Sequence, residues 1–455
     1  MKPPVKKGSV YEIEVVDLNH RGQGVAKIEG FTIFINDGIP GDRGRIKINI
    51  LKKNYGVGEF IDIKIPSKWR IEAPCHVVDK CGGCQIQKID YKKQLEIKRD
   101  RVENDMKRIG GLQNIIIHDT LGMEEPFRYR NKAQFPVSEG KDFVKIGFYK
   151  KGTHDIVDTN VCIIQHPITD KVIKIIRNYM KKYNVNPYNE KTSKGIIRHI
   201  LTKTSFKTGE LMVVIVTNGN ILPYKDKLVE ELIKQIKDVK TVVQNINTRK
   251  TNVILGHKTK TLYGHGKIVD YIDDLKFNIS PLSFFQVNSI QTETLYNKAL
   301  EYTGLQGDEI VFDLYSGLGS ISLFLAKKAK KVYGIEVIKP AIEDAKENAK
   351  LNRIKNVEFH SGKVEEVFPK LYKQGIKADV VVVDPPRKGC DQKVLDTIVE
   401  MNPKKVVYVS CNPATLARDL KYLGENGYKT LEIQPVDMFP HTVHVETVVL
   451  IVASS

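Results

Sequence analysis

The stretch Glu309-Ile310-Val311-Phe312-Asp313-Leu314-Tyr315-Ser316-Gly317-Leu318-Gly319-Ser320 decides how the second half of this chain is expected to fold. Its apolar first half predicts a buried strand, and its two glycines predict a tight turn that leads into a helix. A dinucleotide-binding turn would need a third glycine at position 322, where this chain has Ser322. The stretch therefore predicts a cofactor-binding turn in an α/β sheet and disfavours a nicotinamide or flavin cofactor.

The strand predicted over residues 331–336 follows this turn and ends on an acidic residue. Glu336 comes 23 residues after Asp313, and a carboxylate at the tip of a second strand can accept hydrogen bonds from both hydroxyls of a ribose. The pattern Asp-x-x-x-Gly-x-Gly before it suits S-adenosylmethionine, because that molecule has no pyrophosphate that requires a third glycine. We therefore expect Asp313, Gly317 and Glu336 to contact S-adenosylmethionine.

Two more apolar runs end on polar residues that belong at the same edge of the sheet. Ala378-Asp379-Val380-Val381-Val382-Val383 leads into Asp384-Pro385-Pro386-Arg387, and Val406-Val407-Tyr408-Val409 leads into Ser410-Cys411-Asn412-Pro413. In open α/β sheets, ligands bind at the edge where the carboxyl ends of the strands meet. The alternation of strands and helices therefore predicts a doubly wound, Rossmann-like methyltransferase domain over residues 276–455.

Cys411 and Glu446 supply the two groups that methylation of a weakly nucleophilic aromatic carbon needs. A thiolate that adds to C6 of uracil turns C5 into an enolate-like carbon, which can accept a methyl group from a sulfonium. A base must then remove the C5 proton before the thiolate is expelled. Cys411 is the predicted nucleophile, and Glu446, at the head of the strand predicted over residues 444–450, is the predicted base. Taken singly, a buried core cysteine and a surface acid are the ordinary interpretations.

Length and charge point to several domains and to an anionic polymer as partner. A chain of 455 residues with 41% hydrophobic content exceeds what one core usually fills, so two or three domains are expected. Residues 276–455 contain 23 Lys and Arg against 22 Asp and Glu, whereas residues 1–275 contain 49 against 32. A strongly basic front part indicates nucleic acid binding, with a lysine-rich solvated surface as the alternative.

No signal peptide or apolar run of membrane length is present, so we expect a cytoplasmic protein without a membrane partner.

The basic front part divides into two predicted domains. Short alternating strands with glycine-rich turns predict an OB-like β-barrel over residues 1–64. Residues 65–275 predict an α+β domain with an antiparallel sheet. Within it, Tyr91 to Ile109 is interpreted as a helix that bridges domains and can pack on the catalytic domain. Aromatic and basic residues interleave over residues 127–135, which suits base stacking beside phosphate contacts, although an exposed strand edge explains the pattern nearly as well.

Four cysteines in the predicted central region indicate a metal site. Cys75, Cys81 and Cys84 follow the spacing C-x5-C-x2-C, and Cys162 completes the set. In a chain without an export signal, disulfides are disfavoured. Four thiolates suit either zinc or an iron-sulfur cluster, and the spacing does not choose between them.

Four motifs resemble those of the bacterial RNA uracil-5-methyltransferase family. They are Asp313-Leu314-Tyr315-Ser316-Gly317, Asp384-Pro385-Pro386-Arg387, Ser410-Cys411-Asn412-Pro413-Ala414-Thr415-Leu416-Ala417-Arg418-Asp419, and Phe439-Pro440-His441-Thr442 with His444-Val445-Glu446. The resemblance extends over nearly the whole chain. It implies that the barrel is a TRAM domain, that the four cysteines bind a [4Fe-4S] cluster, and that the substrate is 23S ribosomal RNA, because transfer RNA members generally lack both features. No obligate protein partner is implied.

The same resemblance assigns roles to individual residues. Gln286, in Ser283-Phe284-Phe285-Gln286-Val287-Asn288, together with Tyr315, Glu336 and Asp384 is implied to contact S-adenosylmethionine. Cys411 is implied to be the nucleophile and Glu446 the base. One departure is Ser361-Gly362-Lys363 after the third strand, where many methyltransferases place an acid or amide against the adenine.

Three other functions are weighed against this one. An amino-group methyltransferase usually has an aromatic residue after its Asp-Pro-Pro turn, where this chain has Arg387. An RNA cytosine-5-methyltransferase usually has a cysteine directly after a proline, whereas Cys390 lies four residues beyond Pro386. A non-catalytic ribosomal RNA-binding protein would not need both Cys411 and Glu446. The cytosine enzyme and the binding protein stay as the alternatives.

Overall fold

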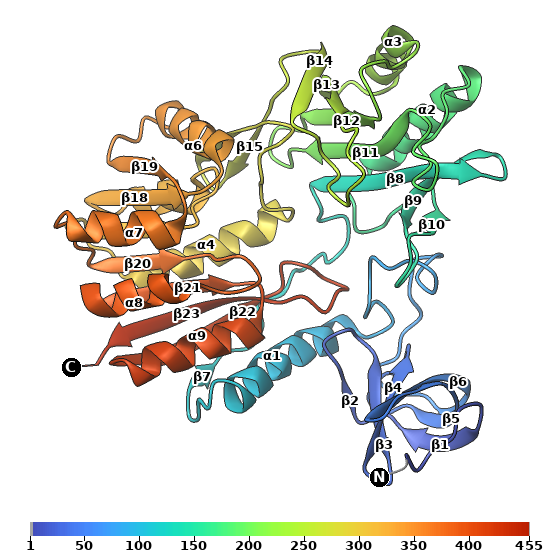
Figure 1. The fold of residues 1–455 in the computed structure, drawn as a ribbon, viewed down its shortest axis with the longest axis horizontal. Coiled ribbons are helices and arrows are strands. Elements are labelled where there is room, and N and C mark those ends of the chain that lie inside the picture. The colour runs from blue at the N-terminus through green and yellow to red at the C-terminus, as the bar shows by residue number, and fades with distance from the viewer. Residues whose placement is uncertain (1–2, 455) are drawn as a thin grey trace.

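The computed structural model describes residues 3–454, which form three bodies (Figure 1). A small barrel holds the amino terminus, a green sheet with its own helices lies above it, and a larger sheet in yellow to red forms the other side. The barrel contacts the rest through a cluster in which Ile39 packs with Ile86, Ile89 and Val443. No helix between residues 3 and 454 combines the length and apolar character that a bilayer crossing requires.

The barrel is a six-stranded sheet in the order β1-β5-β6-β4-β3-β2. Alternate residues point inward, as the period of two in the sequence predicts, and bury isoleucines such as Ile33, Ile35, Ile46 and Ile48. Its strands are β1 (Val10–Glu14), β2 (Asp17–Leu18), β3 (Gly24–Ile28), β4 (Phe31–Asn36), β5 (Arg43–Leu51) and β6 (Tyr55–Ile65).

The central sheet has seven strands in the order β10-β9-β8-β11-β12-β13-β14. Most neighbours are antiparallel, as the sequence predicts, but β12 and β13 are parallel. The reason is α3, which links these two strands as a crossover. The elements are β8 (Lys132–Gly140), β9 (Phe143–Tyr149), β10 (Ile156–Asp158), α2 (Ile168–Lys182), β11 (Ile197–Thr204), β12 (Leu211–Thr217), α3 (Lys225–Gln235), β13 (Val239–Ile246) and β14 (Lys258–Tyr263).

The catalytic sheet has eight strands in the order β19-β18-β17-β20-β21-β23-β22-β7. Its first five strands are parallel and β23 is antiparallel to its neighbours, which confirms the doubly wound fold predicted from the motifs. The elements are β17 (Ile310–Leu314), α5 (Ser320–Ala326), β18 (Lys331–Glu336), α6 (Lys339–Leu351), β19 (Val357–Ser361), α7 (Val364–Lys373), β20 (Val380–Val383), α8 (Gln392–Met401), β21 (Lys405–Ser410), α9 (Pro413–Glu425), β22 (Tyr428–Val436) and β23 (Glu446–Ala453).

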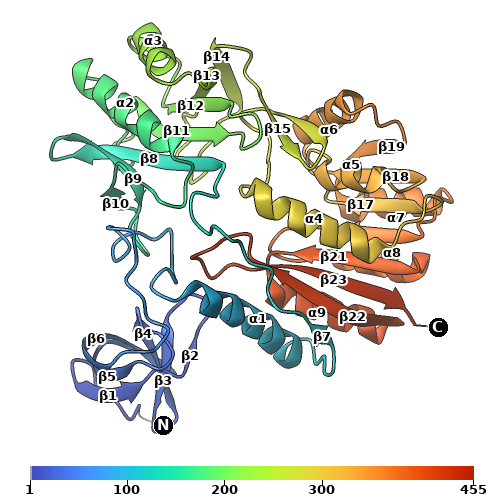
Figure 2. The ribbon, with the colours of Figure 1, turned by 180° about the vertical axis from the view of Figure 1, so that it is seen from behind.

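Helices cover both faces of this sheet, which explains its nearly uninterrupted apolar strands. Val380 and Val382 face a core shared with α4 (Ser289–Thr303) and α5, whereas Val381 and Val383 face a second core shared with α7, α8 and α9. Figure 2 shows α4 crossing the sheet on the side opposite to α9. Burial on both sides leaves only the strand ends accessible, so the polar residues that follow the strands line the open edge.

Two elements from the front of the chain complete the catalytic unit. Helix α1 (Tyr91–Arg108) contributes Val102 and Met106 to the core beneath α9, and β7 (Ile116–Ile117) pairs in parallel with β22 at the sheet edge. The predicted boundary at residue 275 falls within the hairpin of β15 (Ile268–Ile272) and β16 (Leu275–Ile279). The catalytic sheet is therefore built from two segments of chain that the central domain separates.

Candidate active site

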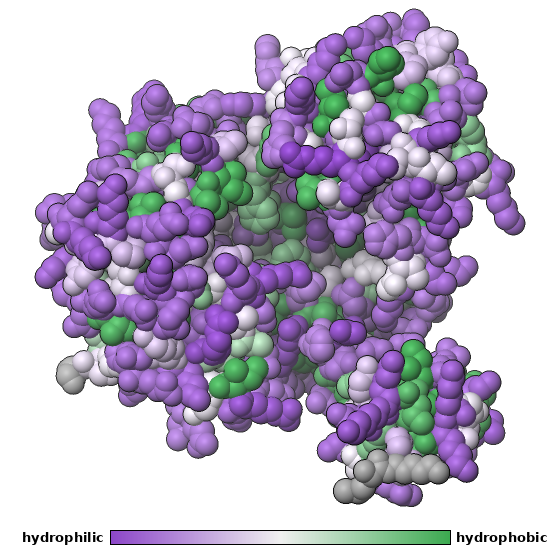
Figure 3. Space-filling model, in the orientation of Figure 1, coloured by the Kyte–Doolittle hydropathy of each residue, from purple (hydrophilic) through white to green (hydrophobic). Residues whose placement is uncertain are grey.

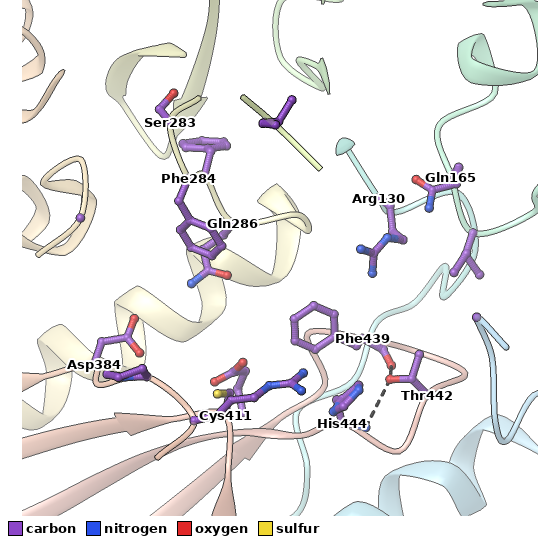
Figure 4. A pocket seen from close by; sticks show the side chains of 18 of the residues that line it. Arg130, Gln165, Ser283, Phe284, Gln286, Asp384, Cys411, Phe439, Thr442 and His444 are labelled. Carbon is purple, nitrogen blue, oxygen red and sulfur yellow. Dashed lines mark hydrogen bonds between the residues drawn. The ribbon is translucent and has the colours of Figure 1, made fainter. Parts of the chain in front are cut away.

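A cavity of about 1340 Å³ lies in the hollow between the three bodies. Its floor is the carboxyl edge of the catalytic sheet, and its other walls come from the cysteine-rich segment and the loops beside the central sheet. Figure 3 shows the hollow with hydrophobic side chains at its floor and hydrophilic side chains around its rim. Figure 4 shows side chains of both walls pointing into it.

The turn after β17 has the backbone conformation that its glycines predict. Gly319 begins α5 with φ of 83°, and a Cβ there would lie 2.8 Å from the ring of Phe359, so only glycine fits. Gly317 has φ of 56° and lines the cavity, with no atom within 4 Å of the position of a Cβ. The missing side chain of Gly317 therefore leaves room for a ligand to approach the backbone.

Glu336 is held at the tip of β18 by two backbone amides. Its carboxylate accepts hydrogen bonds from the amide of Gly317 at 3.1 Å and from the amide of Ile338 at 2.8 Å. Each carboxylate oxygen has a second lone pair, and the residue lines the cavity. The arrangement is suited to bind a pair of vicinal hydroxyls such as those of a ribose.

Asp313 and Asp384 occupy different positions, although both were expected to contact the cofactor. Asp384 lines the cavity, whereas Asp313 lies behind it and accepts a hydrogen bond from Ser322 Oγ. Burial raises the pKa of both carboxyls to about 7, and Asp313 contributes to the shift of Asp384. Asp313 therefore supports the turn from within the fold.

Cys411 and Glu446 are brought together by the pairing of β21 with β23. Ser410 pairs with Thr447 in antiparallel register, and the Thr447 hydroxyl donates to the Ser410 carbonyl at 3.2 Å. The residues that follow and precede this pair are Cys411 and Glu446, which therefore lie opposite each other at the strand ends. Both line the cavity.

The charges around Cys411 oppose its ionisation, with one exception. Burial first, and then Glu446 and Asp384, raise the pKa of the Cys411 thiol to about 11, whereas Arg387 lowers it. Burial also raises the pKa of Glu446 well above its usual range, and Arg387 again acts in the opposite direction. Arg387 is thus the cation that favours the charged forms of both residues.

The position of Arg387 beside Cys411 was not predicted from the sequence. Its carbonyl accepts hydrogen bonds from the Asn412 side-chain amide at 2.9 Å and from the Thr415 hydroxyl at 3.2 Å. The sequence contains the information needed for this prediction, because Arg387 and Cys411 follow the ends of two strands that are neighbours in the sheet.

The side chains that surround Cys411 in the cavity include an amide, aromatic rings and a cation. Gln286 lines the cavity, and its main-chain carbonyl accepts a hydrogen bond from Asn131 Nδ2 at 2.9 Å. Phe284 is 65% exposed and, like Phe439, points into the cavity (Figure 4). Arg130, from the stretch where aromatic and basic residues interleave, lines the wall on the opposite side. Aromatic rings and a cation are groups that bind unstacked bases and phosphates.

The four cysteines line the other end of the same cavity. Cys84 and Cys162 pack against Tyr129, and the neighbouring thiols add to the effect of burial in raising the pKa of each of these two cysteines. Between residues 3 and 454, however, no three His, Cys, Asp or Glu side chains are placed to hold a metal ion. The four thiols thus share one cavity, but the set of metal ligands that the sequence predicts is not formed within residues 3–454.

The strand order, the glycine turn and the acid at the tip of β18 define a methyltransferase that uses S-adenosylmethionine. The family model described as tRNA (Uracil-5-)-methyltransferase matches residues 90–454, and the TRAM domain model matches residues 4–61. The chain belongs to this RNA uracil-5-methyltransferase family, and its barrel is a TRAM domain.

Similar proteins cover the chain from end to end. An uncharacterized RNA methyltransferase of Clostridium tetani is 51% identical over 447 residues, which cover 98% of this chain and 97% of the relative. One from Bacillus cereus is 51% identical over 450 residues, covering 99% and 98%. Among solved structures, the tRNA (uracil-54, C5)-methyltransferase of Pyrococcus abyssi in complex with S-adenosyl-L-homocysteine has a TM-score of 0.78 and 27% identity, covering 97% of this chain and 100% of that chain.

Proposed function

We propose that this protein methylates C5 of a uracil in 23S ribosomal RNA, with Cys411 as nucleophile and Glu446 as base. The observation that carries the proposal is the register of β21 and β23, which sets these two side chains opposite each other in one cavity. Gln286, Tyr315, Gly317, Glu336 and Asp384 line the same cavity and are the proposed cofactor contacts. Asp313 contributes indirectly, through its hydrogen bond with Ser322.

The reaction proceeds by covalent catalysis. Cys411 attacks as its thiolate, its sulfur bonds to C6 of the uracil, and the electron pair of the C5–C6 double bond moves to form an enolate. C5 takes the methyl group from the sulfonium, which leaves a neutral thioether. Glu446 then removes the C5 proton, the C5–C6 double bond forms again and the Cys411 thiolate is released. Arg387 favours the charged forms that both side chains must adopt.

Cys75, Cys81, Cys84 and Cys162 are proposed to hold a [4Fe-4S] cluster. Their shared end of the cavity and their soft sulfur donors support this assignment. The cluster would orient RNA or stabilise the fold, because the methyl-transfer steps need no electron. Iron and acid-labile sulfide measured after anaerobic purification test it. Stoichiometric zinc without sulfide would overturn it, and activity that follows reduction would overturn the non-redox role.

The substrate is tested by transfer of labelled methyl from S-adenosylmethionine to unmodified 23S RNA, followed by nucleoside analysis. We expect 5-methyluridine. The product 5-methylcytidine would keep the thiolate chemistry but make the protein a cytosine enzyme. No incorporation into ribosomal or transfer RNA would favour a non-catalytic RNA-binding protein.

Transfer RNA is the second candidate substrate. The Pyrococcus abyssi tRNA enzyme covers 97% of this chain, so a barrel-containing architecture also occurs in an enzyme that acts on tRNA. The choice of 23S RNA therefore depends on the four cysteines together with the barrel. Parallel assays with unmodified transfer RNA distinguish the two, and preferential methylation of tRNA would replace the proposed substrate.

A further inference from the structure

The loop over residues 437–445 connects β22 to β23 and ends directly before the proposed base. Val436 and Glu446 are paired across the two strands, so the loop closes at Glu446. Burial and Asp384 raise the pKa of Glu446 and Arg387 opposes them, and no hydrogen bond from the described residues contributes to the shift. The position of this carboxyl therefore depends on the backbone that the loop holds in place.

A fully buried ion pair fixes the start of this loop. Lys98 of α1 is 1% exposed and Asp437 is 0% exposed, and the two are in contact. Lys98 Nζ also donates to the carbonyl of Phe439 at 3.1 Å. The Asp437 carboxylate further accepts from the Tyr91 hydroxyl at 2.9 Å and from the amide of Phe439 at 3.2 Å. Every one of these bonds joins the loop to α1 or to itself.

The same face of α1 contacts the rest of the loop. The side chain of Gln94 accepts from the amide of His441 at 3.0 Å, and that of Arg101 donates to the carbonyl of Val443 at 2.7 Å. With Lys98, these residues are spaced by four and then three positions, which places them in one stripe of the helix. A buried polar stripe on a helix is unusual, because burial normally favours apolar side chains. Here each side chain of the stripe forms a hydrogen bond with a backbone group of the loop.

We propose that Lys98 and Asp437 are positioning residues, which set the loop and thereby align Glu446 with the C5 proton of the Cys411 adduct. This inference rests on the proposed function. A base must lie within hydrogen-bonding reach of its proton, and a misplacement of about 1 Å can cost about a hundredfold in rate. An apolar pair could fill the same space without the directional bonds. The ion pair therefore serves alignment rather than stability alone.

The test compares Lys98→Met/Asp437→Leu, which leaves no unpaired buried charge, with the wild type and with Lys98→Arg. We expect the double variant to bind S-adenosyl-L-homocysteine and unmodified 23S transcript normally and to form the covalent adduct. Release of the methylated RNA should slow by about tenfold or more, so that kcat and KM fall together while kcat/KM, which reports the steps up to methyl transfer, stays unchanged. Lys98→Arg should recover part of the rate.

Two controls make the outcome decisive. Arg177→Met/Asp158→Leu removes an ion pair of the central sheet, remote from the loop, and should change neither step. Glu446→Gln establishes the assay by trapping the adduct. If Glu446→Gln traps no adduct, the base lies elsewhere, and the assignment of Glu446 in the proposed function fails. If Glu446→Gln traps it but the folded double variant keeps full kcat, or slows adduct formation and release equally, only the positioning role fails.

Discussion

The side-chain amide of Asn412 donates to the main-chain carbonyl of Arg387 at 2.9 Å. The residue after the proposed nucleophile thus holds the cation that favours its thiolate. Asn412 also caps α9 by accepting from the amide of Ala414 at 3.3 Å. The loop after β20 and the helix after β21 are therefore fixed to each other at the site of chemistry.

Asn412→Ala should weaken the effect of Arg387 on Cys411. We expect a loss of about 1 kcal/mol in unfolding free energy from the lost cap. Because Arg387 lowers the Cys411 pKa, its displacement should also shift the pH profile of iodoacetamide alkylation of Cys411 to higher pH. Asn426→Ala, at the other end of α9, is the control. An unchanged alkylation profile would show that Asn412 does not position Arg387.

Cys411→Ala should abolish turnover and adduct formation while leaving cofactor affinity unchanged, because the glycine turn and Glu336 are untouched. Cys390→Ala is the matched variant. Cys390 is 6% exposed, so loss of its buried sulfur should cost about 1 kcal/mol of stability and spare the chemistry. Turnover is followed by labelled methyl transfer and binding by calorimetry. Activity in Cys411→Ala would remove it as nucleophile.

Glu446→Gln should trap protein on RNA, since the C5 proton could no longer leave after methylation. The amide keeps the shape of the side chain but has no useful basicity. A denaturing gel should show a protein-RNA band that the wild type does not accumulate. Glu432→Gln, on the neighbouring strand β22, is the control acid. If only free protein migrates, the base lies elsewhere.

Asp384 should make the free protein less stable as the pH rises. Its pKa is about 7 in the folded state against an ordinary value of 3.8. The unfolded chain therefore releases this proton first, and stability is lost between about pH 4 and pH 7, on the order of a few kcal/mol. Asp384→Asn should unfold at a higher temperature than the wild type at about pH 8 and at the same temperature below about pH 4. Asp308→Asn, at an exposed position, should show no such difference. If the unfolding temperature of Asp384→Asn equals that of the wild type at every pH, the prediction is wrong.

Glu336→Gln should weaken cofactor binding by about ten- to a hundredfold, because one oxygen that accepts from the Gly317 or Ile338 amide becomes a donor. Calorimetry with S-adenosyl-L-homocysteine measures the change. Glu343→Gln, exposed on α6, should bind like the wild type. Unchanged affinity in Glu336→Gln would remove it from the proposed ribose contacts.

The sequence was sufficient to predict the catalytic strands, because helices bury both of their faces and the apolar runs are therefore nearly unbroken. The residues at their ends were predictable for the same reason, since Glu336 and Asp384 are the first polar groups after their runs and Cys411 comes directly after Ser410, the first polar group of the third run. Which of these side chains line the cavity was less predictable. Asp313 belongs to the same motif but lies behind the cavity, because its carboxyl accepts a hydrogen bond from Ser322.

What the sequence could not predict depends on contacts between distant segments. A helix rich in charge such as α1 suggests a solvated bridge, and only its pairing with the loop before β23 explains why Lys98 is buried. The parallel pairing of β12 with β13 likewise depends on the path of α3, which periodicity does not describe.

The contact between Lys98 and Asp437 spans 339 positions of the chain. At a synthesis rate of about 5–20 residues per second, α1 would leave the ribosome roughly 17–68 s before its partner loop. During that interval its polar stripe remains hydrated and its apolar face lacks α9 and β22. The barrel and the central sheet can form in the meantime, whereas the catalytic domain can close only when residues 437–446 arrive. Translation order thus places assembly of the active site after synthesis of the barrel and the central sheet.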